Sequence, residues 1–191
     1  MSKSLRVLIA DDESIIRMGL RAILTDLGHT VISASDGVEA VTLAHRDPPD
    51  IALLDIRMPF RDGLEAAREI VQLRPIPIII LTAFSDTGLL DQAAAIPVQG
   101  YLVKPVKRDD LIAAMRMAMA TFGEKRELKE KVEQLEEKLT SRKLIDRAKG
   151  VLMKDGMTET EAYHEIQIRA RSRRTTMSQI AQELIGKTAA A

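Results

Sequence analysis

The sequence of 191 residues contains no cysteine, which excludes disulfide bonds and thiolate metal sites. Such a composition fits a reducing compartment such as the cytoplasm. No apolar run approaches the ~20 residues of a membrane-spanning helix. The first apolar run is too short for a signal peptide and is followed at once by acidic residues. We therefore expect a cytoplasmic protein with no membrane partner.

A net charge of one sign is also missing, because 28 basic residues balance 28 acidic residues. The balance hides an asymmetry along the chain. Residues 1–123 carry 13 basic and 16 acidic side chains, whereas residues 141–191 carry 10 and 6. The acidic front and the basic tail indicate different partners. The length predicts one ordinary domain and one smaller domain.

Short β-branched runs alternate with amphipathic helical stretches up to about residue 122. The predicted strands are Leu5–Ala10, Thr30–Ser33, Ile51–Asp55, Ile76–Leu81 and Gly100–Val103, and the predicted helices are Ser14–Leu27, Gly37–Arg46, Gly63–Arg74, Asp86–Ala95 and Arg108–Phe122. Strict alternation of this kind predicts a parallel sheet with helices on both faces. The pattern predicts an α/β, flavodoxin-like (βα)5 domain over residues 5–122.

The helical pattern that begins at Arg108 continues without a turn signal to Asp155–Gly156. Within it, apolar residues recur at alternating spacings of four and three, with charges between them: Leu128, Val132, Leu135 and Leu139. This spacing predicts a coiled-coil helix over residues 123–141 that pairs with a second helix. The simpler interpretation is one solvated helix with an ordinary apolar stripe.

Two short helices are predicted beyond Gly156. Thr158 and Thr176 are each followed three residues later by Glu or Gln, which is the capping-box pattern. We expect helices over Glu159–Arg171 and Met177–Ile185, with Gly186 as the C-cap of the second. Together with the end of the long helix they form a small three-helix all-α domain over residues 139–186. A domain of this size needs support from the coiled coil or from a dimer partner.

Polar residues lie at or just beyond the ends of four predicted strands: Asp11 and Asp12, Asp55, Thr82, and Lys104. The carboxyl ends of parallel strands meet at one edge of the sheet, where doubly wound proteins bind ligands. Crowded carboxylates repel one another, which favours a bound cation. Mg²⁺ prefers oxygen ligands of this type. Asp12 and Asp55 are predicted as direct ligands, and Asp11 as a ligand bound directly or through water.

Asp55 is the predicted nucleophile of this edge, because a neutralised carboxylate can attack a phosphoryl donor to give an acyl phosphate. Lys104 would pair with the transferred phosphoryl oxygens, and Thr82 would donate a hydrogen bond to another oxygen. A purely structural role of the acids as helix caps and turn formers is the simple alternative. A nucleotide site is less favoured, because no glycine-rich loop follows the first strand.

These residues resemble the receiver domain of two-component response regulators over residues 5–122. The motifs that carry the resemblance are Asp11–Asp12, D-x-x-M-P-x-x-D-G over Asp55–Gly63, Leu81–Ala83, and Y-x-x-K-P over Tyr101–Pro105. The resemblance implies that a sensor histidine kinase phosphorylates Asp55 with Mg²⁺ present. It also implies that Thr82 and Tyr101 shift together to signal this change.

The same resemblance implies that the backbone carbonyl of Arg57 joins the metal ligands and that the Lys104–Pro105 peptide is cis. Such a protein is a switch rather than an enzyme, with at most slow self-dephosphorylation. Arg57 and Phe84 flank the expected path of an attacking water, so we expect their bulk to slow hydrolysis of the phosphoaspartate.

The basic residues of the tail are the candidate contacts to an anionic partner: Arg142, Lys143, Arg147, Lys149, Lys154, Arg169, Arg171, Arg173 and Arg174. A solvated face is the simple explanation of such a set. Two details favour a binding role. Gly150 lies within a helix beside Lys149, where glycine costs ~1 kcal/mol relative to alanine and permits close approach of a phosphate or another helix. The arginines that end the following helix exceed what capping requires.

The tail resembles the ANTAR domain, an RNA-binding output module, over Leu139–Ile185. The resemblance rests on R-x-x-I-x-x-A-K-G-x-L-M over Arg142–Met153 and on Glu161–Tyr163. It implies binding to paired RNA hairpins through their loops, which prevents transcription termination. The candidate RNA contacts are Arg142, Arg147, Ala148, Lys149 and Gly150. Tyr163 is the only aromatic residue of the tail, so base stacking is limited and readout relies on hydrogen bonds and phosphate contacts.

Three functions follow from these patterns. The first is a phosphorylation-controlled RNA-binding antiterminator that is a homodimer at least when phosphorylated. The second is a DNA-binding regulator, which is disfavoured because Met177–Ile185 has no Arg or Lys to enter a major groove. The third is a signalling dimer that acts on a protein partner. Salt-dependent binding to an RNA hairpin and to duplex DNA separates them.

Overall fold

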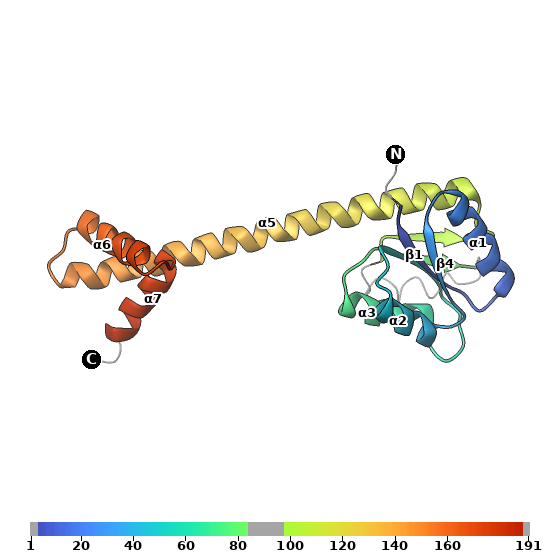
Figure 1. Ribbon diagram of the computed structural model, residues 1–191, viewed down its shortest axis with the longest axis horizontal. Helices are drawn as coiled ribbons and strands as arrows, with labels where there is room; N and C mark the ends of the chain where they lie inside the picture. Colours follow the sequence, from blue (N-terminus) through green and yellow to red (C-terminus); the bar gives the residue numbers. More distant parts are fainter. Residues whose placement is uncertain (1–3, 84–97, 189–191) are drawn as a thin grey trace. The chain divides into compact units, whose positions relative to one another are not determined.

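The computed structural model describes residues 4–83 and 98–188 (Figure 1). The chain forms two compact units, residues 1–125 and 126–191. One uninterrupted helix of 47 residues, α5 (Arg108–Lys154), begins in the first unit and ends in the second. The prediction that the helical pattern continues from Arg108 to the turn at Asp155–Gly156 is therefore confirmed.

The first unit is built on a five-stranded parallel sheet (Figure 1). Its strands are β1 (Arg6–Ala10), β2 (Thr30–Ala34), β3 (Ile51–Asp55), β4 (Ile78–Thr82) and β5 (Gly100–Val103), in the spatial order β2-β1-β3-β4-β5. The chain reverses its direction of progress across the sheet between β1 and β3. The carboxyl ends of these two strands therefore border the crevice in which such folds bind ligands. The flavodoxin-like prediction is confirmed.

Helices cover both faces of this sheet. α1 (Ser14–Asp26) and the start of α5 pack on one face around Leu24 and Leu111, whereas α2 (Gly37–Arg46) and α3 (Gly63–Leu73) pack on the other around Ile70. Burial from both sides explains why β3 and β4 are fully buried along their length. The predicted helix Asp86–Ala95 lies outside the described residues.

The bounds of β4 differ from the prediction. The strand begins at Ile78 rather than Ile76 and includes Thr82. Pro77 has no amide hydrogen to donate to a neighbouring strand, although its carbonyl accepts a hydrogen bond from the Ala52 amide at 3.1 Å. The extension through Thr82 places that hydroxyl at the carboxyl edge of the sheet.

The second unit packs the end of α5 against α6 (Glu159–Ser172) and α7 (Met177–Thr188). Its core consists of small and aliphatic side chains: Ala148, Leu152, Ala162, Ile166, Ala170, Ile180 and Ala181. The predicted capping box is present, because Thr158 and Glu161 each accept a hydrogen bond from the other's backbone amide. The prediction of Gly186 as a C-cap is wrong. α7 continues through Gly186, which keeps a negative φ instead of the left-handed conformation of a glycine cap.

The predicted coiled-coil positions of α5 are exposed. Leu128, Val132, Leu135 and Leu139 have exposed fractions of 64%, 45%, 59% and 59%. A row of exposed aliphatic side chains on a helix is typical of a surface that another helix covers. In the described part of the chain, no helix is long and apolar enough to cross a membrane.

Candidate phosphoacceptor site and basic helical surface

Three carboxylates meet at the carboxyl edge of the sheet. Asp11 and Asp12 follow β1, and Asp55 is the last residue of β3. One carboxylate oxygen from each lies within 4.8 Å of the others. Asp11 is fully buried and Asp55 is 5% exposed, whereas Asp12 is open to solvent. The structure thus brings together the three acidic side chains that the sequence predicts as metal ligands.

Lys104 bridges two of these carboxylates. Its Nζ lies 2.8 Å from Asp11 Oδ2 and 2.9 Å from Asp55 Oδ1. The Lys104 amide donates to the Thr82 carbonyl at 2.9 Å, which fixes the lysine beside the end of β4. The Lys104–Pro105 peptide is cis, as predicted. One ammonium group against three carboxylates leaves an excess of negative charge at this edge.

The donor set fits a magnesium ion. Asp11 Oδ1 accepts a hydrogen bond from the Glu13 amide at 2.9 Å, which orients the carboxylate. Asp11 Oδ2 is buried, and within the described residues no hydrogen-bond donor is aligned with it, although Lys104 lies close. Carboxylate oxygens with unused acceptor capacity are the ligands that Mg²⁺ prefers. Asp11, Asp12 and Asp55 are therefore the residues that would hold the ion.

A cavity of about 540 Å³ lies beside this cluster, lined by residues that include Asp12, Arg57 and Met58. It leaves the edge of the sheet accessible to a ligand. Arg57 is exposed here, and the role of its backbone carbonyl as a metal ligand stays a prediction. Phe84, the other residue expected to slow hydrolysis, lies outside the described residues.

Burial changes the acid–base properties of the site. Desolvation raises the pKa of Asp55 to about 6, because the hydrogen bond and charge of Lys104 offset only part of the cost and the other two carboxylates add to it. Burial alone would lower the pKa of Lys104, but its contacts with Asp11 and Asp55 outweigh burial and raise it. At neutral pH the site therefore contains an ionised Asp55 carboxylate beside a charged ammonium group.

Two further residues, Arg17 and Gly63, help to determine the shape of this site. Arg17 Nη1 donates to the carbonyls of Asp11 at 2.7 Å and Asp12 at 2.9 Å, which fixes the loop after β1. Gly63 ends the motif Asp55–Gly63, and a Cβ atom there would lie 1.9 Å from the Asp55 carbonyl oxygen. Arg17 could have been identified from the sequence, because it lies one turn into the helix that follows Asp11 and Asp12.

The two predicted switch residues lie on neighbouring strands. Thr82 is 4% exposed, and its hydroxyl donates to the Ala83 carbonyl at 3.1 Å. Tyr101 lies on β5 in register with Ile80, and it is 42% exposed. The threonine hydroxyl is therefore at the site, whereas the tyrosine ring reaches solvent from the edge strand.

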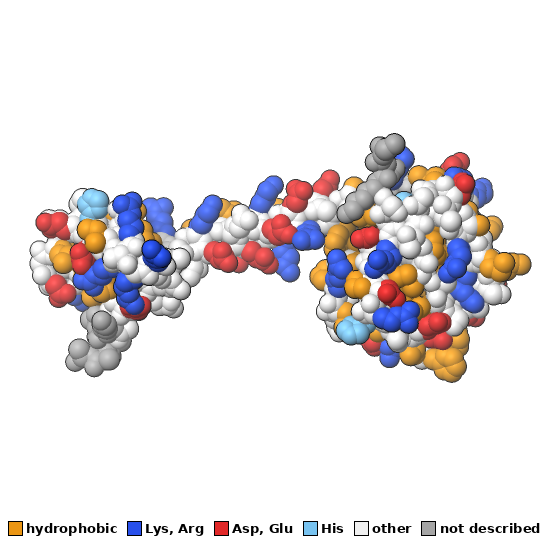
Figure 2. Space-filling view, in the orientation of Figure 1, with side chains coloured by type: hydrophobic (Ala, Val, Ile, Leu, Met, Phe, Trp, Pro, Cys, Tyr) orange, Lys and Arg blue, Asp and Glu red, His pale blue; other side chains and the backbone are white. Residues whose placement is uncertain are grey.

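The predicted RNA contacts in the second unit have different environments. Arg142 and Arg147 are exposed on α5, in the unit where Figure 2 shows basic side chains gathered on the visible face. Ala148 is fully buried in the helical core, so it packs and is not available for contact. Gly150 is exposed, and a Cβ atom there would meet nothing within 4 Å.

Lys149 is held within the protein. Its Nζ lies 2.8 Å from Asp146 Oδ1 on the same helix and 2.8 Å from Glu159 Oε1 at the start of α6. Its side chain is only 15% exposed. The hydrogen bonds to these two carboxylates raise the pKa of Lys149. Lys149 therefore links α5 to α6. Two carboxylates balance its positive charge, so it is less available to an RNA phosphate than the sequence alone suggests.

Comparisons with known proteins agree with both units. The family model of the response regulator receiver domain matches residues 7–116, and that of the ANTAR domain matches residues 133–185. The transcriptional regulatory protein PdtaR of Mycobacterium tuberculosis is 46% identical over 182 residues, which cover 94% of this chain and 89% of that protein. The positive alginate biosynthesis regulatory protein of Pseudomonas aeruginosa is 42% identical over 117 residues, covering 60% of this chain and 47% of that protein.

Solved structures match the first unit. The signal receiver domain of a modulated diguanylate cyclase from Desulfovibrio desulfuricans is 34% identical, with a TM-score of 0.61, over 64% of this chain and 99% of that one. The receiver domain of a sensor histidine kinase from Pseudomonas aeruginosa, with magnesium coordinated in its active site cleft, is 32% identical, with a TM-score of 0.57, over 62% of this chain and 99% of that one. This chain thus belongs to the response regulator family, with a receiver domain followed by an ANTAR domain.

Proposed function

We propose that this protein is a cytoplasmic, phosphorylation-controlled RNA-binding regulator. A sensor histidine kinase phosphorylates Asp55, and the modified protein binds RNA hairpins through its ANTAR domain to prevent transcription termination. The observation that carries the proposal is the contact of Lys104 with both Asp55 and Asp11 in a receiver domain joined to a basic helical domain. The protein acts as a switch and not as an enzyme, with at most slow self-dephosphorylation.

The geometry at Asp55 supports the proposed phosphorylation step. A carboxylate oxygen of Asp55 attacks the phosphorus of the kinase phosphohistidine, a phosphorus–oxygen bond forms, and the phosphorus–nitrogen bond breaks with its electron pair left on the imidazole. Lys104, now 2.9 Å from Asp55 Oδ1, pairs with the transferred oxygens. Asp11, Asp12 and Asp55 would hold Mg²⁺, which would supply positive charge next to the phosphoryl group when bound.

Thr82 connects this step to the rest of the receiver domain. Its hydroxyl now donates to the Ala83 carbonyl, and we expect it to donate to a phosphoryl oxygen after the transfer. Such a rotation moves the end of β4, and Tyr101 on the neighbouring strand follows it. Regulation then means that the phosphorylated arrangement has a higher affinity for one partner surface than the unphosphorylated arrangement.

Dimerisation through α5 is the second element of the proposal. The row formed by Leu128, Val132, Leu135 and Leu139 is exposed and apolar. Ion pairs between Arg126 and Glu130 and between Lys129 and Glu133 lie on the same segment. A parallel pair of such helices buries the row and keeps the charges at its flanks. A homodimer, at least when phosphorylated, presents two ANTAR domains to paired hairpins.

The test of this function is a binding titration of the full chain with an RNA hairpin and with duplex DNA of matched charge, each at several salt concentrations. We expect tighter binding to the hairpin and an affinity that falls as salt rises, because exposed cations such as Arg142 and Arg147 displace counterions. Equal affinity for both nucleic acids contradicts RNA recognition. Absence of binding to either after phosphorylation favours a protein partner instead.

A further inference from the structure

Tyr163 is an exposed aromatic residue with no role in the core of its domain. It is the only aromatic residue between positions 126 and 191, and it is 45% exposed. The core-facing positions of α6 are Ala162, Ile166 and Ala170, spaced four residues apart. The ring of Tyr163 lies outside this stripe, so packing of the three helices does not explain it.

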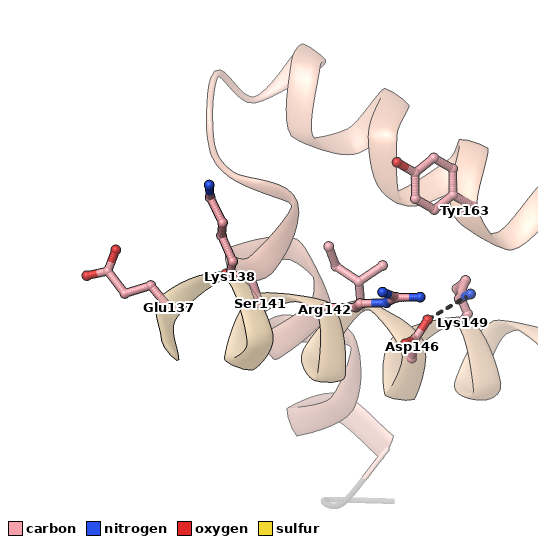
Figure 3. Close-up of a pocket in the computed structure, with 8 residues that line it drawn as sticks. Glu137, Lys138, Ser141, Arg142, Asp146, Lys149 and Tyr163 are labelled. Carbon is pink, nitrogen blue, oxygen red and sulfur yellow. Dashed lines mark ion pairs between the residues drawn. The ribbon is translucent and has the colours of Figure 1, made fainter. Parts of the chain in front are cut away.

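The Tyr163 ring lines a cavity of about 570 Å³ between α5 and α6. Figure 3 shows the ring coming from α6 and the side chains of Arg142 and Lys149 coming from α5. Ile145 adds a second apolar side chain to the lining. The size lies within the ~300–1,000 Å³ typical of small-molecule sites. One side of the cavity is therefore suited to a flat apolar group.

Two cationic side chains of the cavity can attract an anion next to that flat group. The two charged groups of Asp146 and Lys149 pair with each other at 2.8 Å, as the dashed line in Figure 3 marks. Lys138 and Arg142 also line the cavity, and both are exposed. Within the part of this domain that the structure describes, no ion pair involves either of them. Glu137 lies at the same rim and Glu159 also pairs with Lys149, so the charges around the cavity balance overall and the attraction for an anion is local to Lys138 and Arg142.

We propose that this cavity takes one unpaired base of an RNA loop, stacked on the Tyr163 ring, with the neighbouring phosphate on Arg142. The inference rests on the proposed RNA-binding function and assigns its base-recognition subsite. An unpaired base is required because stacking needs an exposed base face, which neighbouring pairs cover in a duplex. Lys149 is a positioning residue in this arrangement. Its ion pairs with Asp146 and Glu159 hold α6 against α5 and set the width of the cavity.

The test compares Tyr163→Leu, which removes the ring, with Tyr163→Phe, which keeps it, in the full-length chain. The ligand is the RNA hairpin that binds the wild-type protein most tightly from a pool with randomised loop sequences. Loss of one base stack weakens binding about 10-fold, whereas Tyr163→Phe changes it less than about twofold. Circular dichroism of each variant checks that the helices are intact, as expected for an exposed position.

A second measurement distinguishes stacking from a structural effect. Abasic sites are placed at each loop position of the selected hairpin in turn. At one position, removal of the base weakens binding to the wild-type protein and leaves binding to Tyr163→Leu unchanged. Arg142→Gln instead makes the plot of log affinity against log salt less steep, by an amount that corresponds to about one phosphate contact. Tyr163→Leu leaves this slope unchanged.

Two outcomes overturn the inference in distinguishable ways. Equal hairpin affinity of Tyr163→Leu and the wild type, or abasic effects that are the same in both proteins, removes the Tyr163 subsite and leaves RNA binding in place. Failure of the wild-type protein to select any hairpin from the pool removes the proposed function and the subsite together.

Discussion

Replacement of Asp55 by asparagine should change how the stability of the receiver domain depends on pH. Burial raises the pKa of Asp55 from its ordinary value of 3.8 to about 6 in the folded domain. The folded state therefore binds the proton more tightly than the unfolded state. The ionisation of Asp55 costs stability progressively as pH rises from below 3.8 to above 6, and the cost is complete at neutral pH. Asp55→Asn has no such ionisation.

The magnitude follows from the difference between the two pKa values. One pKa unit corresponds to 1.36 kcal/mol, so between pH 4 and pH 7.5 the wild type should lose about 2 kcal/mol relative to Asp55→Asn. The pKa of about 6 already includes the attraction of Lys104. The assay is denaturant unfolding of both full-length proteins at a series of pH values in the presence of a metal chelator.

Addition of Mg²⁺ at pH 7.5 provides a second comparison of the stability of the wild type and Asp55→Asn. An ion that binds only the folded domain stabilises it in proportion to the logarithm of its concentration. It should therefore stabilise the wild type more than the variant, which lacks one of three carboxylates. A stability difference between the two proteins that is constant from pH 4 to pH 7.5 within about 0.5 kcal/mol would refute the assignment of the buried, high-pKa carboxylate to Asp55.

Three further predictions concern single positions. Gly63→Ala forces a Cβ atom to within 1.9 Å of the Asp55 carbonyl oxygen, so we expect a loss of roughly 2 kcal/mol or more in unfolding free energy. Gly19→Ala is the matched control, because nothing lies within 4 Å of its Cβ position; equal effects of the two substitutions would contradict the close approach. Arg17→Gln frees the carbonyls of Asp11 and Asp12 and should weaken Mg²⁺ affinity about 10-fold by calorimetry; unchanged affinity would show that the loop is fixed without it. Leu135→Glu places a charge in the exposed apolar row of α5 and should lower the dimer fraction of the phosphorylated protein in sedimentation experiments, whereas Glu136→Gln beside it should not.

The fold of the receiver domain was largely predictable from sequence because strands buried on both faces are continuous aliphatic runs. β3 and β5 have the predicted bounds. Errors arose where one residue decides a boundary, as at Pro77 before β4 and at Gly186 inside α7. A glycine ends a helix only when its backbone adopts the left-handed conformation, and the sequence does not specify that choice.

The site was predictable to the extent that topology determines it. Polar residues at the ends of parallel strands must meet, and Asp11, Asp55 and Lys104 do so. Contacts made across the fold were not predictable in the same way. The pairing of Lys149 with Glu159 crosses the turn between two helices and converts an apparent RNA contact into a link between them. The burial of Ala148 likewise depends on how the three helices pack.

The central claim is that the state of Asp55 controls RNA binding, and one comparison tests it most directly. Hairpin affinity is measured for the full-length wild type and Asp55→Asn, each with Mg²⁺ and with or without acetyl phosphate as a small phosphoryl donor. We expect the donor to increase the affinity of the wild type and to leave that of Asp55→Asn at the basal level of the untreated protein. An equal response of the two proteins, or no response of the wild type once its phosphorylation has been verified by mass, would contradict the account.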